Sequence, residues 1–197
     1  MKGVRISPGF WLMAAAVWLI EPDLLAPTFF AAAVHEAGHV AALLAVGGRV
    51  EGFTLAALGA QLRLSAGLSY ARELPVALAG PVCSLVLAVG AGRTGDFLLA
   101  GISLALGLFN LMPIAPLDGG RVVGCLGGIF LSPPAAERME GAVAAVALGG
   151  ILALGGICLR QGYGPGLLAM GLWLGWSVLH GEKKSLTFWP KAHRIGK

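Results

Sequence analysis

The chain has 197 residues, of which 57% are apolar and 12% are charged, whereas soluble domains have roughly 25% charged residues. The charged residues separate apolar blocks that approach the roughly 20 residues needed to cross a bilayer core, so the composition indicates a membrane protein and argues against a large soluble core. The formal net charge of +4 does not indicate nucleic-acid binding, because the basic residues are scattered and no stacking platform or nucleic-acid motif accompanies them.

Six apolar blocks are expected to form transmembrane helices. In chain order they cover about residues 10–20, 28–46, 74–92, 97–112, 142–159 and 166–179. The first block is short and follows Lys2 and Arg5, a pattern that also describes a signal peptide, but no clear cleavage site follows it. Whether this block is retained or removed, the second block is expected to enter the membrane from outside the cell.

The segment between the second and third blocks, residues 49–72, is less apolar. Within it, polar and apolar residues alternate with the period of two that is typical of a half-buried strand: Gln61, Leu62, Arg63, Leu64, Ser65 and Ala66. Because Gly59 separates this run from residues 49–58, a β-hairpin is predicted. The expected fold is an all-α membrane protein of about six transmembrane helices, with a small membrane-associated β-hairpin between the second and the third.

The basic residues predict the orientation. If both termini and alternate loops share one side, only Arg93 and Arg160 lie on the other. The twelve on the shared side are Lys2, Arg5, Arg49, Arg63, Arg72, Arg121, Arg138, Lys183, Lys184, Lys191, Arg194 and Lys197. Since positive residues concentrate in cytoplasmic loops, this split predicts a multi-pass protein of a bacterial-type cell membrane with cytoplasmic termini. Residues 1–180 are expected to form one membrane domain, and residues 181–197 a short basic cytoplasmic tail.

The second block contains the sequence His35-Glu36-Ala37-Gly38-His39. Histidines four residues apart on a helix share one face, so both can bind one metal ion. In an H-E-x-x-H helix the glutamate can take a proton from zinc-bound water, whose pKa the metal lowers to about 7. Polar packing between helices is the alternative, but an ionisable residue in a membrane span costs about 2.5–3.5 kcal/mol, and three in one span favour a functional site.

Zinc held by two histidines needs a third protein ligand, for which Asp118 is the best candidate. It follows Pro113 and Pro116, which prevent a regular helix, and it precedes Gly119 and Gly120, which allow the chain to bend. From this segment alone, an ordinary loop aspartate before a glycine turn is an equal alternative.

Asn110 lies inside the fourth block. Its amide can donate a hydrogen bond to a substrate carbonyl or to the developing oxyanion. Hydrogen bonding between helices is an equal alternative for this residue.

The chain resembles the site-2 protease family of intramembrane metalloproteases, whose pattern is H-E-x-x-H on one span and N-x-x-P-x-x-x-x-D-G on a later one. The later element runs here from Asn110 to Gly119, and Ala79-Gly80-Pro81 matches an A-G-P element that the family carries between the two. The resemblance covers about residues 29–121. It implies that one zinc ion is bound by His35, His39 and Asp118, with Glu36 as the general base and Asn110 helping to hold the substrate.

The six-span outline looks most like the stage IV sporulation protein FB branch, which processes an inactive sigma-factor precursor. By this resemblance the protein is a zinc metalloendopeptidase that cleaves a membrane-embedded or membrane-associated protein, such as a sigma-factor precursor or an anti-sigma factor. Its partners would be that substrate, the lipid bilayer and regulatory membrane proteins. One departure from the pattern is Ser84, which stands where many relatives have Asn after A-G-P.

Other classes of membrane protein also carry intramembrane His, Glu and Asp residues. A metal-ion or proton transporter is the main alternative, although transport does not require a glutamate beside the first of two histidines at i and i+4. A scaffold protein would tolerate the loss of Glu36, and a different H-E-x-x-H family with a distal glutamate ligand would not need the segment from Asn110 to Asp118. Gly171 and Gly175 form a G-x-x-x-G pattern, which in so glycine-rich a chain is weak evidence for dimerisation.

Overall fold

The computed structural model describes residues 5–6, 19, 21–48, 50–56, 59–64 and 68–185. Most of the first apolar block and of the basic tail lies outside these residues, so what the sequence indicates for both remains a prediction. The chain divides into two compact units, residues 1–111 and 112–197.

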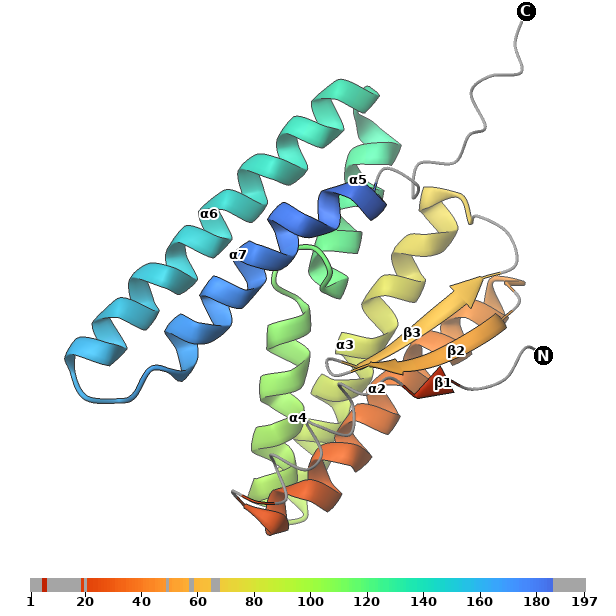
Figure 1. The fold of residues 1–197 in the computed structure, drawn as a ribbon. Helices are drawn as coiled ribbons and strands as arrows, with labels where there is room; N and C mark the ends of the chain where they lie inside the picture. The colour runs from red at the N-terminus through yellow and green to blue at the C-terminus, as the bar shows by residue number, and fades with distance from the viewer. Residues whose placement is uncertain are drawn as a thin grey trace, which may run out of the picture. The chain divides into compact units, whose positions relative to one another are not determined.

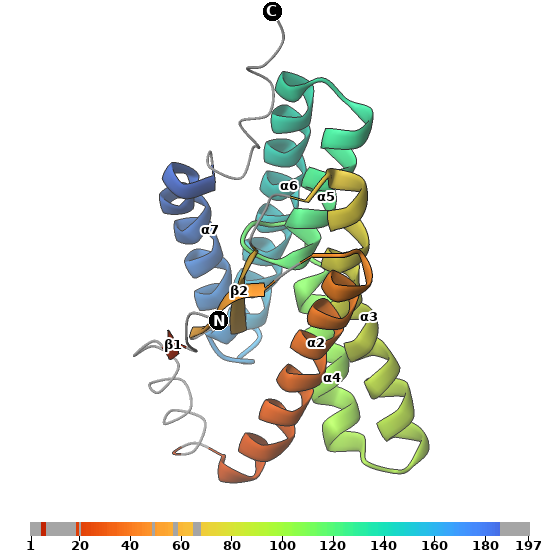
Figure 2. The ribbon, with the colours of Figure 1, turned by 90° about the vertical axis from the view of Figure 1, so that its right-hand side faces the viewer.

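Helices form the core of the first unit. In chain order they are the 3-10 helix η1 (Pro22–Leu24), α2 (Leu25–Ala45), α3 (Tyr70–Arg93) and α4 (Phe97–Asn110). The helices α2, α3 and α4 pack side by side (Figures 1 and 2). Several fully buried residues among them are small, including Ala31, Ala77 and Ser84. Small residues let helices approach closely in lipid, where the usual hydrophobic drive for association is absent.

A three-residue turn joins α3 to α4. Gly95 has a φ of 84°, and the next amide, that of Asp96, donates to the carbonyl oxygen of Ala91 at 3.0 Å. The side chain of Asp96 in turn accepts a hydrogen bond from the amide of Leu99, also at 3.0 Å. Glycine adopts this left-handed conformation without a Cβ penalty, and aspartate is a favoured N-cap. The sequence therefore ends one helix and starts the next within a few residues.

A small sheet belongs to the same unit and lies beside α2 (Figure 1). It consists of β1 (Arg5–Ile6), β2 (Val50–Ala56) and β3 (Gly59–Leu64), in the order β1-β2-β3. β3 pairs antiparallel with β2, whereas β1 pairs parallel with it, Arg5 opposite Thr54. The predicted fold, all-α apart from a two-stranded hairpin, is therefore wrong. A two-residue strand has no periodicity of its own, and its partner is distant in the sequence, so the pattern could not reveal it.

The second unit contains three helices, α5 (Asp118–Phe130), α6 (Pro133–Arg160) and α7 (Gly166–Ser185). α6 and α7 lie side by side (Figure 1). A Cβ atom on Gly155 of α6 would lie 2.8 Å from the backbone of Leu168 in α7, so the two backbones are nearly in contact. Cβ atoms on Gly171 and Gly175 would meet side chains of α6 at 2.9 and 3.2 Å. The G-x-x-x-G pattern thus packs against α6 of the same chain.

The number of membrane spans differs from the predicted six. Among the described residues, three helices are long and apolar enough to cross a membrane, and they cover residues 22–45, 70–93 and 133–160. α4 is apolar but has only 14 residues, or about 21 Å at 1.5 Å per residue, against a bilayer core of about 30 Å. It ends early because the segment after it contains Pro113 and Pro116. The apolar part of α7, residues 166–179, is likewise shorter than a full span.

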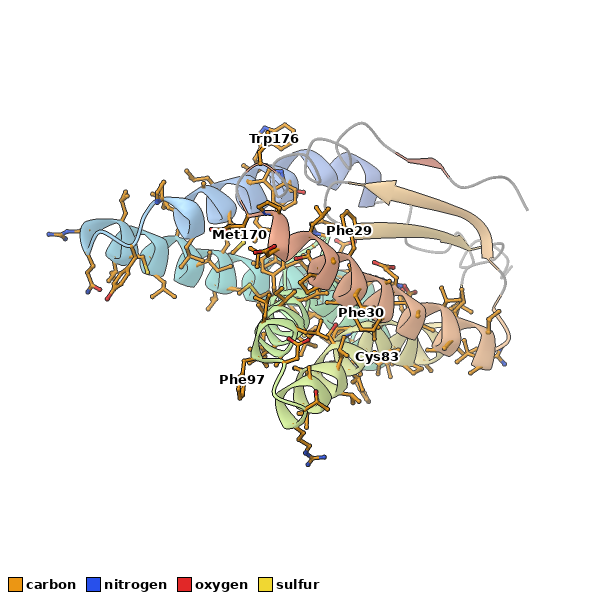
Figure 3. All side chains as sticks on the ribbon, turned by 90° about the horizontal axis from the view of Figure 1, so that it is seen from below. Phe29, Phe30, Cys83, Phe97, Met170 and Trp176 are labelled. Carbon is orange, nitrogen blue, oxygen red and sulfur yellow. The ribbon has the colours of Figure 1, made fainter. Side chains whose placement is uncertain are left out.

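Large apolar side chains lie on the outside of these helices. Phe97 is 77% exposed and Trp176 is 59% exposed, and both point away from the helices that carry them (Figure 3). Val146 on α6 is 78% exposed. An apolar outer face of this kind is unfavourable in water but is the expected surface in lipid. The exposed side chains thus agree with the composition in indicating a membrane protein.

Candidate metal centre

The backbones of α2 and α3 are nearly in contact where they cross. A Cβ atom on Gly38 of α2 would lie 2.7 Å from the carbonyl oxygen of Ala79 and 2.7 Å from the sulfur of Cys83, both in α3. A Cβ atom essentially never approaches other atoms this closely, so the crossing requires glycine at this position. Gly38 directly precedes His39, and the crossing therefore brings this histidine to α3.

His35 and His39 lie together on the face of α2 that meets α3. Each is 4% exposed, their ring centroids are 4.9 Å apart, and their Nε2 atoms are 3.2 Å apart. The helical repeat explains the pairing, because residues at i and i+4 lie above one another on one face. Two imidazole nitrogens are thus directed to one buried place.

Atoms of α3 hold the second nitrogen of each ring. Nδ1 of His39 is 2.7 Å from the backbone carbonyl oxygen of Val76, and Nδ1 of His35 is 2.9 Å from the hydroxyl oxygen of Ser84. Histidines that bind metals almost always donate their other ring nitrogen to such a group, which fixes the orientation of the ring. Both histidines therefore have the outer hydrogen bonds that a metal ligand needs.

The two histidines fit a zinc ion. Zinc–nitrogen bonds of about 2.0–2.1 Å in a tetrahedral arrangement place two ligand nitrogens about 3.3 Å apart. The observed separation of 3.2 Å agrees with this geometry. In addition, the carbonyl oxygen of Val76 can only accept a hydrogen bond, so Nδ1 of His39 carries the proton and its Nε2 presents a lone pair. His39 is thus in the tautomer that binds a metal through Nε2.

The Ala79-Gly80-Pro81 element makes room for the ring of His39. A Cβ atom on Gly80 would lie within 2.7 Å of three atoms of this ring, Nε2 among them. Pro81 lies inside α3, where it removes one amide from the hydrogen-bond ladder but does not end the helix. The glycine of the element forms part of the wall against which the metal-binding nitrogen lies.

Glu36 and Asn110 lie at different places in the first unit. Glu36 follows His35 on α2 and is half-buried. Successive residues of a helix are rotated by about 100°, so Glu36 lies beside the histidine pair. Asn110 is the last residue of α4, and its Nδ2 donates to the carbonyl oxygen of Leu106 at 3.0 Å. This bond lies within α4, whereas the alternative drawn from the sequence was a bond between helices.

Asp118 is the first residue of α5, in the second unit, and is 8% exposed. Nη1 of Arg121, one turn further along the helix, is 3.3 Å from its Oδ1. A negative charge in the first turn also interacts favourably with the helix dipole. Together, the ion pair and the helix start stabilise an ionised carboxylate at this position.

The glycines after Asp118 do not bend the chain as predicted, because Gly119 and Gly120 both lie within α5. The bend precedes the helix, in residues 111–117. A Cβ atom on Gly120 would lie 2.7 Å from the backbone of Ile114 and Ala115. Gly120 is therefore needed for the close approach of this irregular segment to the first turn of α5.

Ser84 had no predicted role, although it is fully buried and hydrogen-bonded to His35. Val76, Gly80 and Ser84 follow one another at intervals of four, so they share one face of α3. Counting four residues on from Gly80 would therefore have identified Ser84 from the sequence. Glu73, in the first turn of α3, was also not selected, and it is only 4% exposed although it carries a carboxyl group.

Comparisons with known proteins agree with this site. Residues 94–154 match the family described as peptidase family M50. A protein of Synechocystis sp. is 35% identical to this chain, and the match covers 57% of this chain and 33% of that protein. Rip3 of Mycobacterium tuberculosis is 30% identical, and the match covers 90% of this chain and 48% of Rip3. Both are named putative zinc metalloproteases. The chain thus spans between a third and a half of the length of these relatives.

The site-2 protease from Methanocaldococcus jannaschii resembles this chain with a TM-score of 0.67, over 91% of both chains and at 18% sequence identity. At this identity the likeness shows a shared fold. The match to peptidase family M50 and the names of the two relatives agree with the resemblance seen in the motifs.

Replacing Gly80 with alanine should weaken zinc binding, because the added methyl group would displace the ring of His39. We expect the affinity for zinc to fall at least about tenfold, as when a supporting contact of a metal ligand is removed. The measurement is chelator competition on the purified protein. Gly90→Ala, in the same helix, is the matched control, since nothing lies within 4 Å of its added Cβ. Equal zinc affinity in both variants would contradict the role given to Gly80.

Proposed function

We propose that the protein is an intramembrane zinc metalloprotease that hydrolyses a peptide bond of a membrane-embedded or membrane-associated protein. The observation that carries the proposal is the pair of Nε2 atoms of His35 and His39, 3.2 Å apart, on a helix where Glu36 lies beside them. The family match and the names of the relatives support the same activity. A histidine pair alone binds a metal, whereas an adjacent carboxylate adds the proton transfer that hydrolysis needs.

Asp118 is proposed as the third ligand of the zinc ion. Like the two histidines it is buried, and each of the three residues offers one ligand atom. Two neutral imidazoles leave the charge of the ion uncompensated in a site of low dielectric constant, and a carboxylate supplies both a ligand and a negative charge. The ion pair with Arg121 supports this role, because it restrains the carboxylate of Asp118.

The side chains would divide the work of hydrolysis as follows. Zinc, when bound, supplies a Lewis acid that polarises the scissile carbonyl and acidifies a water molecule. Glu36 takes a proton from the attacking water as the oxygen bonds to the carbonyl carbon, and it gives a proton to the amine nitrogen as the carbon–nitrogen bond breaks. Asn110 would hold the substrate through its amide, which has two N–H donors, one of them engaged by Leu106.

Glu36 and Asp118 are expected to respond differently to substitution. Glu36→Gln should lower cleavage of a membrane peptide by at least about 10²–10⁴-fold, because the general base is lost, while near-stoichiometric zinc stays bound. Asp118→Ala should lose both cleavage and zinc. The measurements are metal analysis of the purified variants and a cleavage assay with and without a zinc chelator. Full zinc occupancy in Asp118→Ala, with Glu36→Gln empty, would reverse the two assignments.

The same assay separates proteolysis from the main alternative, transport of metal ions or protons. A protease in vesicles cleaves the peptide, and the chelator stops the cleavage. Ion flux that the chelator abolishes, without any cleavage, would instead indicate a transporter.

For the membrane orientation we propose a multi-pass protein of the cell membrane with both termini in the cytoplasm. The twelve-to-two division of the basic residues supports this orientation. Arg93, at the end of α3, would then lie outside the cell, whereas Arg138, in α6, would lie in the cytoplasm. Both side chains are exposed, so either position is suitable for chemical labelling.

Single cysteines at these two positions should react from opposite sides of the membrane. In a protein without Cys83, Cys125 and Cys158, Arg93→Cys should react with an impermeant maleimide in intact cells. Arg138→Cys should react only in inverted vesicles, since it faces the cytoplasm. Labelling of Arg138→Cys in intact cells would contradict the proposed orientation.

The substrate is proposed to be a sigma-factor precursor, the substrate of the stage IV sporulation protein FB branch, or an anti-sigma factor. The motifs support the wider resemblance to site-2 proteases, from which this substrate class is taken. Glu36→Gln protein in native membranes should retain the uncleaved precursor, because it keeps the site but lacks the base. Mass spectrometry after crosslinking identifies the retained protein, and Glu36→Gln combined with Asp118→Ala is the control for binding that does not depend on the metal. Enrichment of proteins unrelated to transcription regulation would exclude this substrate class.

A further inference from the structure

The backbone that carries Asp118 is held by the irregular segment before α5. This segment passes so close to the helix that a Cβ atom on Gly120 would lie 2.7 Å from the amide nitrogen of Ala115 and 2.7 Å from the carbonyl carbon of Ile114. Ile114 is completely buried, and its carbonyl oxygen accepts a hydrogen bond from the amide of Leu117 at 2.8 Å. The first turn of α5 is therefore fixed against its own connection.

The carboxylate of Asp118 is held by a second contact, the ion pair with Arg121. Nη1 of Arg121 is 3.3 Å from Oδ1 of Asp118, and the two residues are three apart, so they share one face of α5. The side chain of Asp118 is 10% exposed and that of Arg121 is 33% exposed. The pair is thus partly removed from water and is screened less than an ion pair on the surface.

Arg121 has another carboxyl group in its neighbourhood, that of Glu140 in α6. Oε1 of Glu140 would lie 3.4 Å from a Cβ atom on Gly124, which is one turn after Arg121 in α5. Long side chains of a helix point towards its N-terminus, and this direction leads from Arg121 to Asp118 and away from Gly124. The direction of the helix therefore favours the ion pair with Asp118.

The number of oxygen atoms that Asp118 gives to a zinc ion decides how many positions remain for other ligands. A catalytic zinc ion has three protein ligands in a tetrahedral arrangement and an open fourth position for water or substrate. A carboxylate that binds through both oxygens would occupy that position or produce a five-coordinate ion. A hydrogen bond from a guanidinium group withdraws electron density from one oxygen, so it favours metal binding through the other.

We propose that Arg121 is a positioning residue that limits Asp118 to one ligand oxygen and so keeps the fourth position of the zinc ion open. Because Arg121 engages Oδ1, Oδ2 is the oxygen assigned to the metal. The inference rests on the proposed function, in which Asp118 is the third ligand, and adds how this ligand binds. Arg121 acts through Asp118 and is not itself assigned as a ligand.

The first test reads the coordination number, with cobalt(II) in place of zinc in the purified full-length protein. Four-coordinate cobalt absorbs visible light strongly, and five-coordinate cobalt absorbs it weakly. Arg121→Met, which lacks N–H donors, should lose much of the wild-type absorption, because Asp118 then binds through both oxygens. Arg121→Lys, which keeps a charged N–H donor, should recover it. Identical spectra for the wild type and Arg121→Met, at equal cobalt content, would overturn the proposal.

Two further variants are the matched controls for this spectrum. Arg138→Met removes the same charge from an exposed position of α6, and Glu140→Gln removes the other carboxylate near Arg121. Both should keep the wild-type spectrum. A loss of absorption in either control as large as that in Arg121→Met would overturn the proposal, because the effect would then not depend on the pair with Asp118.

The second test measures access to the open position, by titrating azide onto the cobalt-loaded proteins. Azide should bind at least about tenfold more weakly to Arg121→Met than to the wild type, whereas Arg121→Lys should bind it nearly as well. Equal azide affinity in Arg121→Met and the wild type would overturn the proposal. A wild-type protein that binds neither zinc nor cobalt, or full zinc occupancy in Asp118→Ala, would instead contradict the proposed function, so the two failures are distinguishable.

Discussion

The histidine pair depends on one close contact, the crossing of α2 and α3 at Gly38 and Gly80. At this crossing the ring of His39 lies against the backbone of α3, and the atoms that hold the two rings, the carbonyl oxygen of Val76 and the hydroxyl of Ser84, come from the same helix face. A methyl group on Gly38 would push the helices apart, and one on Gly80 would displace the ring of His39. The chemistry of the site therefore rests on van der Waals contact between two backbones.

Glycine serves the same purpose in the second unit. Gly155, Gly171 and Gly175 bring α6 and α7 together, and Gly127 lets α5 approach Ala136 of α6. Lipid solvates apolar side chains as well as another helix does, so helices in a membrane gain from close packing and not from burial of apolar area. Other glycines, such as Gly90 and Gly156, have nothing near an added Cβ, and a count of glycines alone does not reveal which of them form contacts.

Polar side chains of the helices also have specific hydrogen-bond or ion-pair partners. His35 pairs with a hydroxyl group, His39 with a carbonyl oxygen, and Asp118 with Arg121. A polar group without a partner is costly in a low dielectric, so these partnerships hold the side chains in single orientations.

Composition and the helical repeat act over short stretches of chain, so they were enough to predict the membrane class and the placement of His35 and His39 on one helix face with Glu36 beside them. The sequence also indicated the family through motifs that need no coordinates. The tertiary structure decided the number of long helices, the pairing of β1 with β2, the start of α5 at Asp118 and the place of Ser84 beside His35. These features depend on contacts between residues distant in the sequence, and on prolines and glycines whose effect changes with their neighbours. Local sequence patterns do not depend on such contacts, so only the folded chain reveals them.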